Sequence, residues 1–88
     1  MLIATGTGFI WEIDDDARDD QELVDAFVEM DAHPERYVRV LELLLGKDGK
    51  KALYEHCRNE KGRVPASRIQ RELFDIIGCM KDAPKTKN

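Results

Sequence analysis

Residues 66–80, ASRIQRELFDIIGCM, carry the most regular apolar spacing in the chain. The apolar side chains recur every three or four positions: Ala66, Ile69, Leu73, Ile76, Ile77 and Met80. This spacing places them on one face of an α-helix, because a helix completes a turn about every 3.6 residues. The segment therefore predicts an amphipathic helix that buries one face against the rest of the protein.

Three similar helical patterns precede this segment, and each has a recognisable start or end signal. Asp19 or Asp20 can begin the first helix by accepting backbone N–H bonds, and Pro34 suits the first position of the second. Gly46 is a natural terminator between the second helix and a third over about 48–59. Their apolar faces contain Leu23, Val24, Phe27, Val28 and Met30, then Tyr37, Val38, Leu41, Leu44 and Leu45, then Leu53, Tyr54 and Cys57.

The N-terminal residues 2–13 predict extended structure. Phe9, Trp11 and Ile13 alternate onto one face of a strand, and residues 5–8, TGTG, are typical of a turn. Residues 2–4 can form the return strand of a hairpin, which needs helical support because an isolated hairpin is marginally stable. We predict a mainly α fold, a small compact bundle of about four helices with a short N-terminal β strand or hairpin. Residues 1–82 form one domain, and residues 83–88 form a polar C-terminal tail.

Charge is unevenly distributed along the 88 residues. Between Glu12 and Glu35 there are eleven acids and one base, Arg18, whereas from Arg36 to Asn88 there are thirteen Lys or Arg and seven Asp or Glu. Part of the acidic excess is local, because acids in a first turn favour helix formation. The opposite-signed halves also predict that copies can self-associate in one register, more weakly in salt.

Composition excludes a membrane span and an exported, disulfide-rich protein. No apolar run approaches the ~20 residues that a bilayer requires. The first residues, MLIAT, lack the basic region of a signal peptide. Cys57 and Cys79 lie in helical patterns without a CxxC partner, so we predict two reduced, mostly buried thiols in a cytoplasmic protein, with a disulfide as the alternative.

No catalytic or metal-ligating pattern stands out in the sequence. His56 and Cys57 are adjacent on one helix, where neighbouring side chains point about 100° apart, so they cannot form a dyad. The two histidines and two cysteines are too scattered for a zinc site. The acids at 14–20 lack the glycine and terminal glutamate spacing of an EF-hand. We therefore predict no enzymatic activity, no cofactor and no metal.

The basic residues of 47–80 provide an alternative hypothesis, a small nucleic-acid-binding or regulatory prophage protein. The relevant residues are Lys50, Lys51, Arg58, Lys61, Arg63, Arg68 and Arg71. They lie on two predicted helices around a short loop, as a helix-turn-helix would require. A pI of about 5.1 disfavours phosphate binding. The interleaved acids Glu55, Glu60, Glu72 and Asp75 also predict ordinary solvated helix faces.

Five segments together resemble a known family: 8–13 (GFIWEI), 19–23 (DDQEL), 40–46 (VLELLLG), 62–65 (GRVP) and 72–77 (ELFDII). Over about residues 8–78 the chain resembles the small tail assembly chaperones of long-tailed bacteriophages and prophages, especially those of Gram-positive hosts. The resemblance implies a non-enzymatic protein of the bacterial host cytoplasm. It would bind the long, helical, apolar tape measure protein and keep it soluble until tail tube subunits polymerise around it.

A chaperone of this kind needs exposed apolar side chains that the core does not use. We expect Phe9, Trp11, Val24, Val28 and Tyr54 to contact the client, because they are the large apolar groups least required by the core. For Phe9 and Trp11 the core is the favoured interpretation by usual burial preferences. An exposed docking edge is the alternative for these two aromatic residues.

Overall fold

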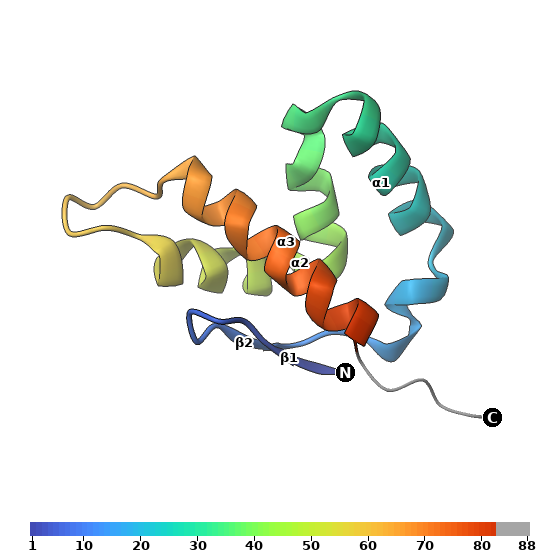
Figure 1. Ribbon diagram of the computed structural model, residues 1–88, viewed down its shortest axis with the longest axis horizontal. Helices are drawn as coiled ribbons and strands as arrows, with labels where there is room; N and C mark the ends of the chain where they lie inside the picture. The colour runs from blue at the N-terminus through green and yellow to red at the C-terminus, as the bar shows by residue number, and fades with distance from the viewer. Residues whose placement is uncertain (83–88) are drawn as a thin grey trace.

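Three α-helices and a two-stranded antiparallel hairpin form the part of the chain that is described, residues 1–82 of a computed structural model (Figure 1). The elements are β1 (Leu2–Ala4), β2 (Ile10–Glu12), η1 (Asp15–Asp19), α1 (Gln21–Ala32), η2 (Pro34–Arg36), α2 (Tyr37–Cys57) and α3 (Ala66–Asp82). The predicted mainly α fold with an N-terminal hairpin is therefore confirmed. The predicted tail at 83–88 lies outside the described residues.

Two of the four predicted helices are the two halves of α2. Gly46 interrupts α2 with φ 74° and ψ 177°, and the helix resumes directly afterwards. Figure 1 shows that residues 37–45 and 47–57 run in different directions from this point. The structure therefore has three helices where about four were predicted, because Gly46 bends one helix and does not end it before a loop.

Gly46→Ala should lower the free energy of unfolding by about 1–3 kcal/mol, because its backbone region is essentially restricted to glycine. Gly78→Ala is the matched control. Gly78 lies within α3, and a methyl group there would meet no atom within 4 Å. The Gly78→Ala variant should therefore be more stable than the wild type by about 0.5–1 kcal/mol. Urea unfolding followed by circular dichroism measures both, and equal effects of the two variants would contradict the kink at Gly46.

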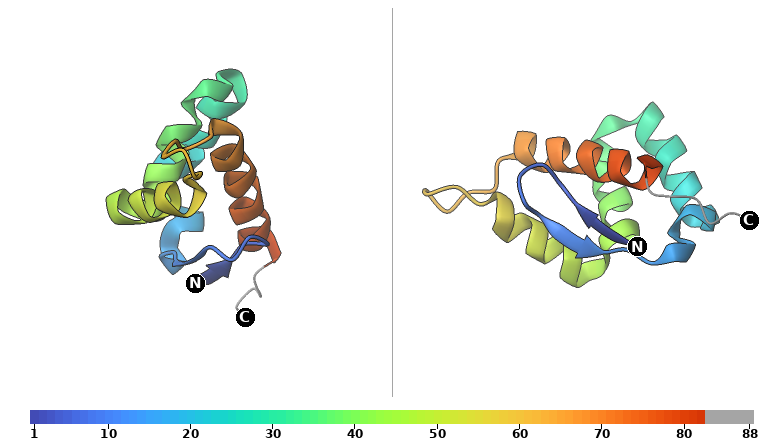
Figure 2. Two further views of the ribbon diagram at one scale, coloured as in Figure 1. Left: turned by 90° about the vertical axis from the view of Figure 1, so that its left-hand side faces the viewer. Right: turned by 60° about the horizontal axis from the view of Figure 1, so that its bottom comes forward.

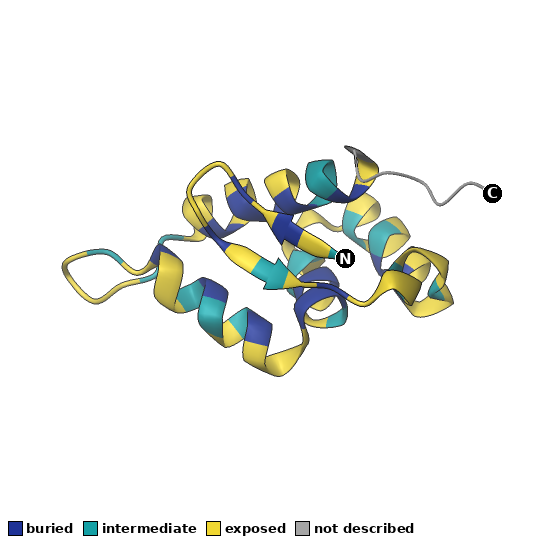
Figure 3. Cartoon of the chain, turned by 90° about the horizontal axis from the view of Figure 1, so that it is seen from below, coloured by how far each residue is buried: buried dark blue, intermediate teal, exposed yellow. Residues whose placement is uncertain are grey.

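The core lies where α1, α3 and the hairpin pack on α2. α1 packs on α2, while α3 packs on both α2 and β1. Figure 3 shows buried residues alternating with exposed ones along the helices and the hairpin, as expected when each element buries one face. The most completely buried large side chains are Ile13, Val40, Leu41, Leu53, Leu73 and Ile76. The apolar stripe of 66–80 thus packs inward as predicted, through Ile69, Leu73, Ile76 and Met80.

The hairpin covers the second half of α2 and part of α3 (Figure 2). Its register pairs Ile3 with Trp11 and Ala4 with Ile10. Ile3, Phe9 and Ile13 are buried, so the predicted alternation along the strand is confirmed. Trp11 lies directly on Gly49 of α2, since a Cβ atom at Gly49 would come within 2.7 Å of the indole ring. The hairpin thus obtains the helical support that its size requires.

Two predicted helix starts are refined by the structure. Asp20 caps α1 as predicted, because its carboxylate accepts a hydrogen bond of 2.9 Å from the Glu22 backbone N–H. Pro34 begins the short η2 helix, and α2 itself starts at Tyr37. Between the hairpin and α1, the acidic segment contains the 3-10 helix η1, which ends at Asp19.

Candidate apolar groove between α1 and α3

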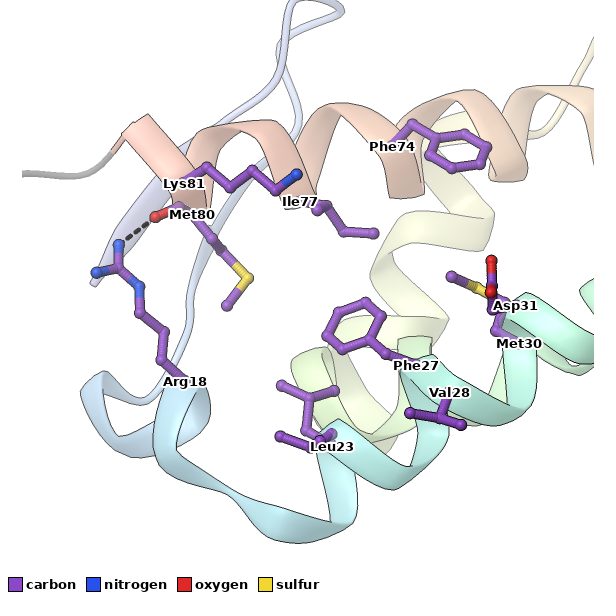
Figure 4. Close-up of a pocket in the computed structure, with 11 residues that line it drawn as sticks. Arg18, Leu23, Phe27, Val28, Met30, Asp31, Phe74, Ile77, Met80 and Lys81 are labelled. Atoms are coloured by element: carbon purple, nitrogen blue, oxygen red, sulfur yellow. Dashed lines mark hydrogen bonds between the residues drawn. The ribbon is translucent and has the colours of Figure 1, made fainter.

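An open groove of about 850 Å³ separates α1 from α3 (Figure 4). Its apolar lining consists of Leu23, Val24, Phe27, Val28 and Met30 from α1 and Phe74, Ile77 and Met80 from α3. Figure 4 shows Phe27 of α1 and Ile77 of α3 pointing into the space between the two helices. Because both helices pack on α2, neither covers the facing side of the other.

Large apolar side chains remain exposed along this groove. Val28 is 66% exposed and Phe74 is 67% exposed, although both lie on helices with a well-packed opposite face. On α1, Leu23 and Ala26 are buried, while Val24 and Val28 lie on an adjoining part of the helix surface. The apolar arc of α1 is therefore wider than the core needs, and its surplus forms one wall of the groove. Contiguous exposed apolar surface of this kind typically marks an interaction site.

A second hollow of about 520 Å³ extends the groove along the same two helices. It shares Met30, Asp31 and Phe74 with the first and continues to Tyr37 and Gln70. The α3 wall thus runs from Gln70 to Lys81, which corresponds to about 16 Å at 1.5 Å per residue. This length matches about three turns of a bound helix.

The ends of the groove carry opposite charges. Arg18 and Lys81 line one end, and the Arg18 guanidinium donates to the backbone carbonyl of Met80. Asp31 and Glu35 lie at the other end, where α1 terminates. The partial negative charge of a helix C-terminus adds to these carboxylates. The groove therefore combines an apolar floor with a charged rim.

Only two of the five predicted client-contact residues lie in this groove, Val24 and Val28. Phe9 is buried in the core, where its ring stacks on Trp11 with centroids 6.2 Å apart. Trp11 is half-buried against Gly49, in agreement with the core interpretation of both aromatics. Tyr54 is half-buried on α2, with the Lys50 ammonium 5.8 Å from its ring centroid. The structure therefore does not bring the five residues together.

Phe74 is the groove residue that sequence analysis missed. It falls beside Leu73, one position off the stripe formed by 66, 69, 73, 76, 77 and 80. Adjacent residues point about 100° apart on a helix, so a large apolar residue off the stripe faces away from the core. The position of Phe74, one residue off the apolar stripe, is therefore the sequence signal that its side chain is exposed. Phe27 and Ile77 lie on the predicted apolar faces of their helices, and both are half-buried at the groove floor.

The outer face of the hairpin presents a second, smaller apolar surface. Leu2 and Ile10 are exposed there, because the alternation that buries Ile3 and Phe9 turns their neighbours outward. Ala4 lies across from Ile10 in the same register. This face is formed by the hairpin alone, and its residues do not line the groove between α1 and α3.

A polar cluster attaches the hairpin turn to α2 and α3. The Thr7 hydroxyl donates to the Glu72 carboxylate at 2.6 Å and lies 3.0 Å from His56 Nε2. Glu72 is only 3% exposed, which corrects the prediction that it lies on a solvated face. The Gly6 N–H donates to Asp75 at 2.8 Å, so two carboxylates of α3 hold the turn.

This cluster does not activate the neighbouring cysteine. Burial and the nearby Glu72 carboxylate raise the pKa of the Cys57 thiol, so that less of it is thiolate at neutral pH. An activated cysteine nucleophile requires the opposite shift. Within residues 1–82, no group of three or more His, Cys, Asp or Glu side chains is placed to hold a metal ion.

Several basic residues of the nucleic-acid hypothesis already contact groups of the protein itself. Arg58 pairs with Glu55 at 2.5 Å, and Lys50 pairs with Glu42 at 2.8 Å. The hydrogen bond from Lys50 lowers the pKa of Glu42, which keeps this carboxylate charged. Arg68 donates to the Cys57 carbonyl at 3.2 Å. These contacts neutralise part of the basic surface that phosphate binding would use.

Comparisons of the chain with protein-family models, curated proteins and solved structures give no match. Among the described helices, none combines the length and the apolar character needed to cross a membrane. The function is therefore inferred from the residues and the groove.

Proposed function

We propose that this protein is a non-enzymatic phage or prophage tail assembly chaperone that binds helical segments of the tape measure protein in the groove between α1 and α3. The observation that carries the proposal is the groove itself, with Val28 of α1 and Phe74 of α3 both exposed among the residues that line it. The resemblance of residues 8–78 to tail assembly chaperones supplies the class of client. The protein would act in the host cytoplasm, where tails assemble.

The shape of the groove suits an amphipathic helix. Such a helix presents apolar side chains at i, i+3, i+4 and i+7, and these can enter a groove of about 850 Å³ between two helices. Burying an exposed Phe or Val side chain contributes about 1.5–3 kcal/mol. A groove with few such anchors gives moderate affinity, which allows the client to be released when tube subunits arrive.

Moderate affinity per groove is compatible with stable protection of a long client. Several copies that occupy neighbouring segments of one tape measure would raise the local concentration of binding sites. The opposite charges in the two halves of the chain can align neighbouring copies on the client. Self-association of this kind should weaken as salt concentration rises.

Coexpression with a segment of the tape measure tests the proposal. A tape measure segment that is insoluble by itself should appear in the soluble fraction and copurify with this protein, because the groove covers its apolar stripe. Client solubility with and without the chaperone is the measurement. The proposal is wrong if the segment stays insoluble while the chaperone is soluble and folded. Retention on DNA at physiological salt, lost when Arg63 and Arg71 are replaced, would instead favour the nucleic-acid alternative.

A further inference from the structure

Every charged side chain of α1 is acidic, and one of them, Asp31, lines the groove. Within α1 there are four acids, Glu22, Asp25, Glu29 and Asp31, and no Lys or Arg. Asp25 precedes Val28 by three residues and Asp31 follows it by three, so both carboxylates lie next to this exposed valine on the helix surface. The apolar edge of the groove is therefore bordered by acids on the α1 side.

Three of these acids have no ion pair within residues 1–82, and two of them, Asp25 and Asp31, flank Val28. Glu29 is already paired with Arg36 at 2.8 Å. Asp31 is exposed, lines both hollows and has no ion pair within residues 1–82. Asp25 is exposed, and among the described residues its carboxylate accepts a single hydrogen bond, of 2.9 Å, from the neutral Gln21 amide. Asp31 also lies in the last turn of α1, where the helix dipole adds negative potential.

We infer that the groove selects an amphipathic helix whose apolar stripe is bordered by lysine or arginine on the side that faces α1. This inference rests on the proposed function, because it specifies the client that the same groove accepts. The opposite end of the groove is lined by Arg18 and Lys81, next to the aspartates of η1, so the lining residues there have mixed charge. The basic border of the client therefore lies over Asp25 and Asp31.

Three synthetic helices separate charge selection from groove binding. All carry the same leucine stripe at i, i+3, i+4 and i+7 and differ only in having Lys, Gln or Glu along one border. The Lys helix should bind about three- to tenfold more tightly than the Gln helix at low salt, as a few exposed ion pairs allow. The Glu helix should bind more weakly than both. The differences should shrink at about 0.5 M salt, where the Debye length is only a few ångströms.

A double variant and a control variant in the loop after α2 test whether Asp25 and Asp31 cause the preference for the Lys helix. Asp25→Asn with Asp31→Asn should abolish the preference for the Lys helix over the Gln helix, because the two carboxylates that attract lysine are then neutral. Glu60→Gln, exposed in the loop after α2, should leave this preference unchanged. Equal binding of all three helices would overturn the inference and leave the proposed function standing. If none of the helices binds and the tape measure segment also fails to bind, the proposed function fails instead.

Discussion

Phe74→Gln should weaken binding of a helical tape measure segment about ten- to a hundredfold and leave the free energy of unfolding within about 0.5 kcal/mol. Phe74 is 67% exposed on α3, so the folded protein loses little packing when the ring is removed. In the complex, the same ring would be buried between the client and the α1 wall. Large aromatic side chains in such positions dominate binding energies. Phe74→Gln should therefore lower the affinity for the client without lowering the stability of the folded protein.

The matched control for Phe74 lies on the hairpin. Ile10 is 58% exposed and apolar, but it lies outside the groove. Ile10→Gln should leave client affinity unchanged, and titration of a labelled client segment compares the two variants. A second groove variant, Val28→Gln, tests the opposite wall and should also weaken binding. If Phe74→Gln and Val28→Gln both bind like the wild type while remaining folded, the groove is not the client site.

Gly49→Ala should lower the free energy of unfolding by about 1–3 kcal/mol, as expected when a methyl group is forced into a filled space. A Cβ atom at this position would lie 2.7 Å from Trp11 Nε1 and 2.7 Å from Leu45 Cβ. Either the indole ring or α2 must move, and displacement of Trp11 also separates the hairpin from α2. The direction is opposite to that of an ordinary glycine to alanine change within a helix, which is favourable by about 0.5–1 kcal/mol.

The single tryptophan makes this change directly measurable. Trp11 is the only Trp of the chain, so its fluorescence reports on the hairpin contact. We expect the emission of Gly49→Ala to shift to longer wavelength, with an earlier urea midpoint. Combining Gly49→Ala with Trp11→Val should recover part of the lost stability, because the two residues are in contact. A stabilised Gly49→Ala variant, similar to Gly78→Ala, would show that Trp11 does not lie on Gly49.

The variants at Phe74 and Gly49 distinguish a loss of client binding from a loss of stability. The same distinction applies to the residues that the sequence predicted to contact a client. Phe9 and Trp11 hold the hairpin on α2, so their replacement would reduce client capture only through loss of folded protein. Val24 and Val28 can be replaced at little cost to the fold, because they are exposed. A client-binding defect at Val28 with unchanged unfolding therefore reports on the groove itself.

Local patterns predicted the elements of this protein well. The three- to four-residue spacing of 66–80 depends only on helix geometry, and the alternation of Phe9, Trp11 and Ile13 depends only on the pleat of a strand. Likewise, the Asp20 cap requires only a side chain near its own backbone. Each feature follows from residues close together in the chain, so sequence by itself was sufficient to predict it.

Burial at the edges of the apolar stripes depended on the tertiary structure. Spacing alone cannot show whether the next helix covers Val28 or Phe74, because that depends on where α1 and α3 sit on α2. Glu72 was expected in solvent and is instead buried, since the hairpin turn places Thr7 within hydrogen-bonding distance. The direction of the chain after Gly46 was likewise set by packing on both sides of the kink. Sequence therefore determined the helices and the hairpin, while the groove arose only from tertiary packing, because two helices that share one support leave their facing sides uncovered.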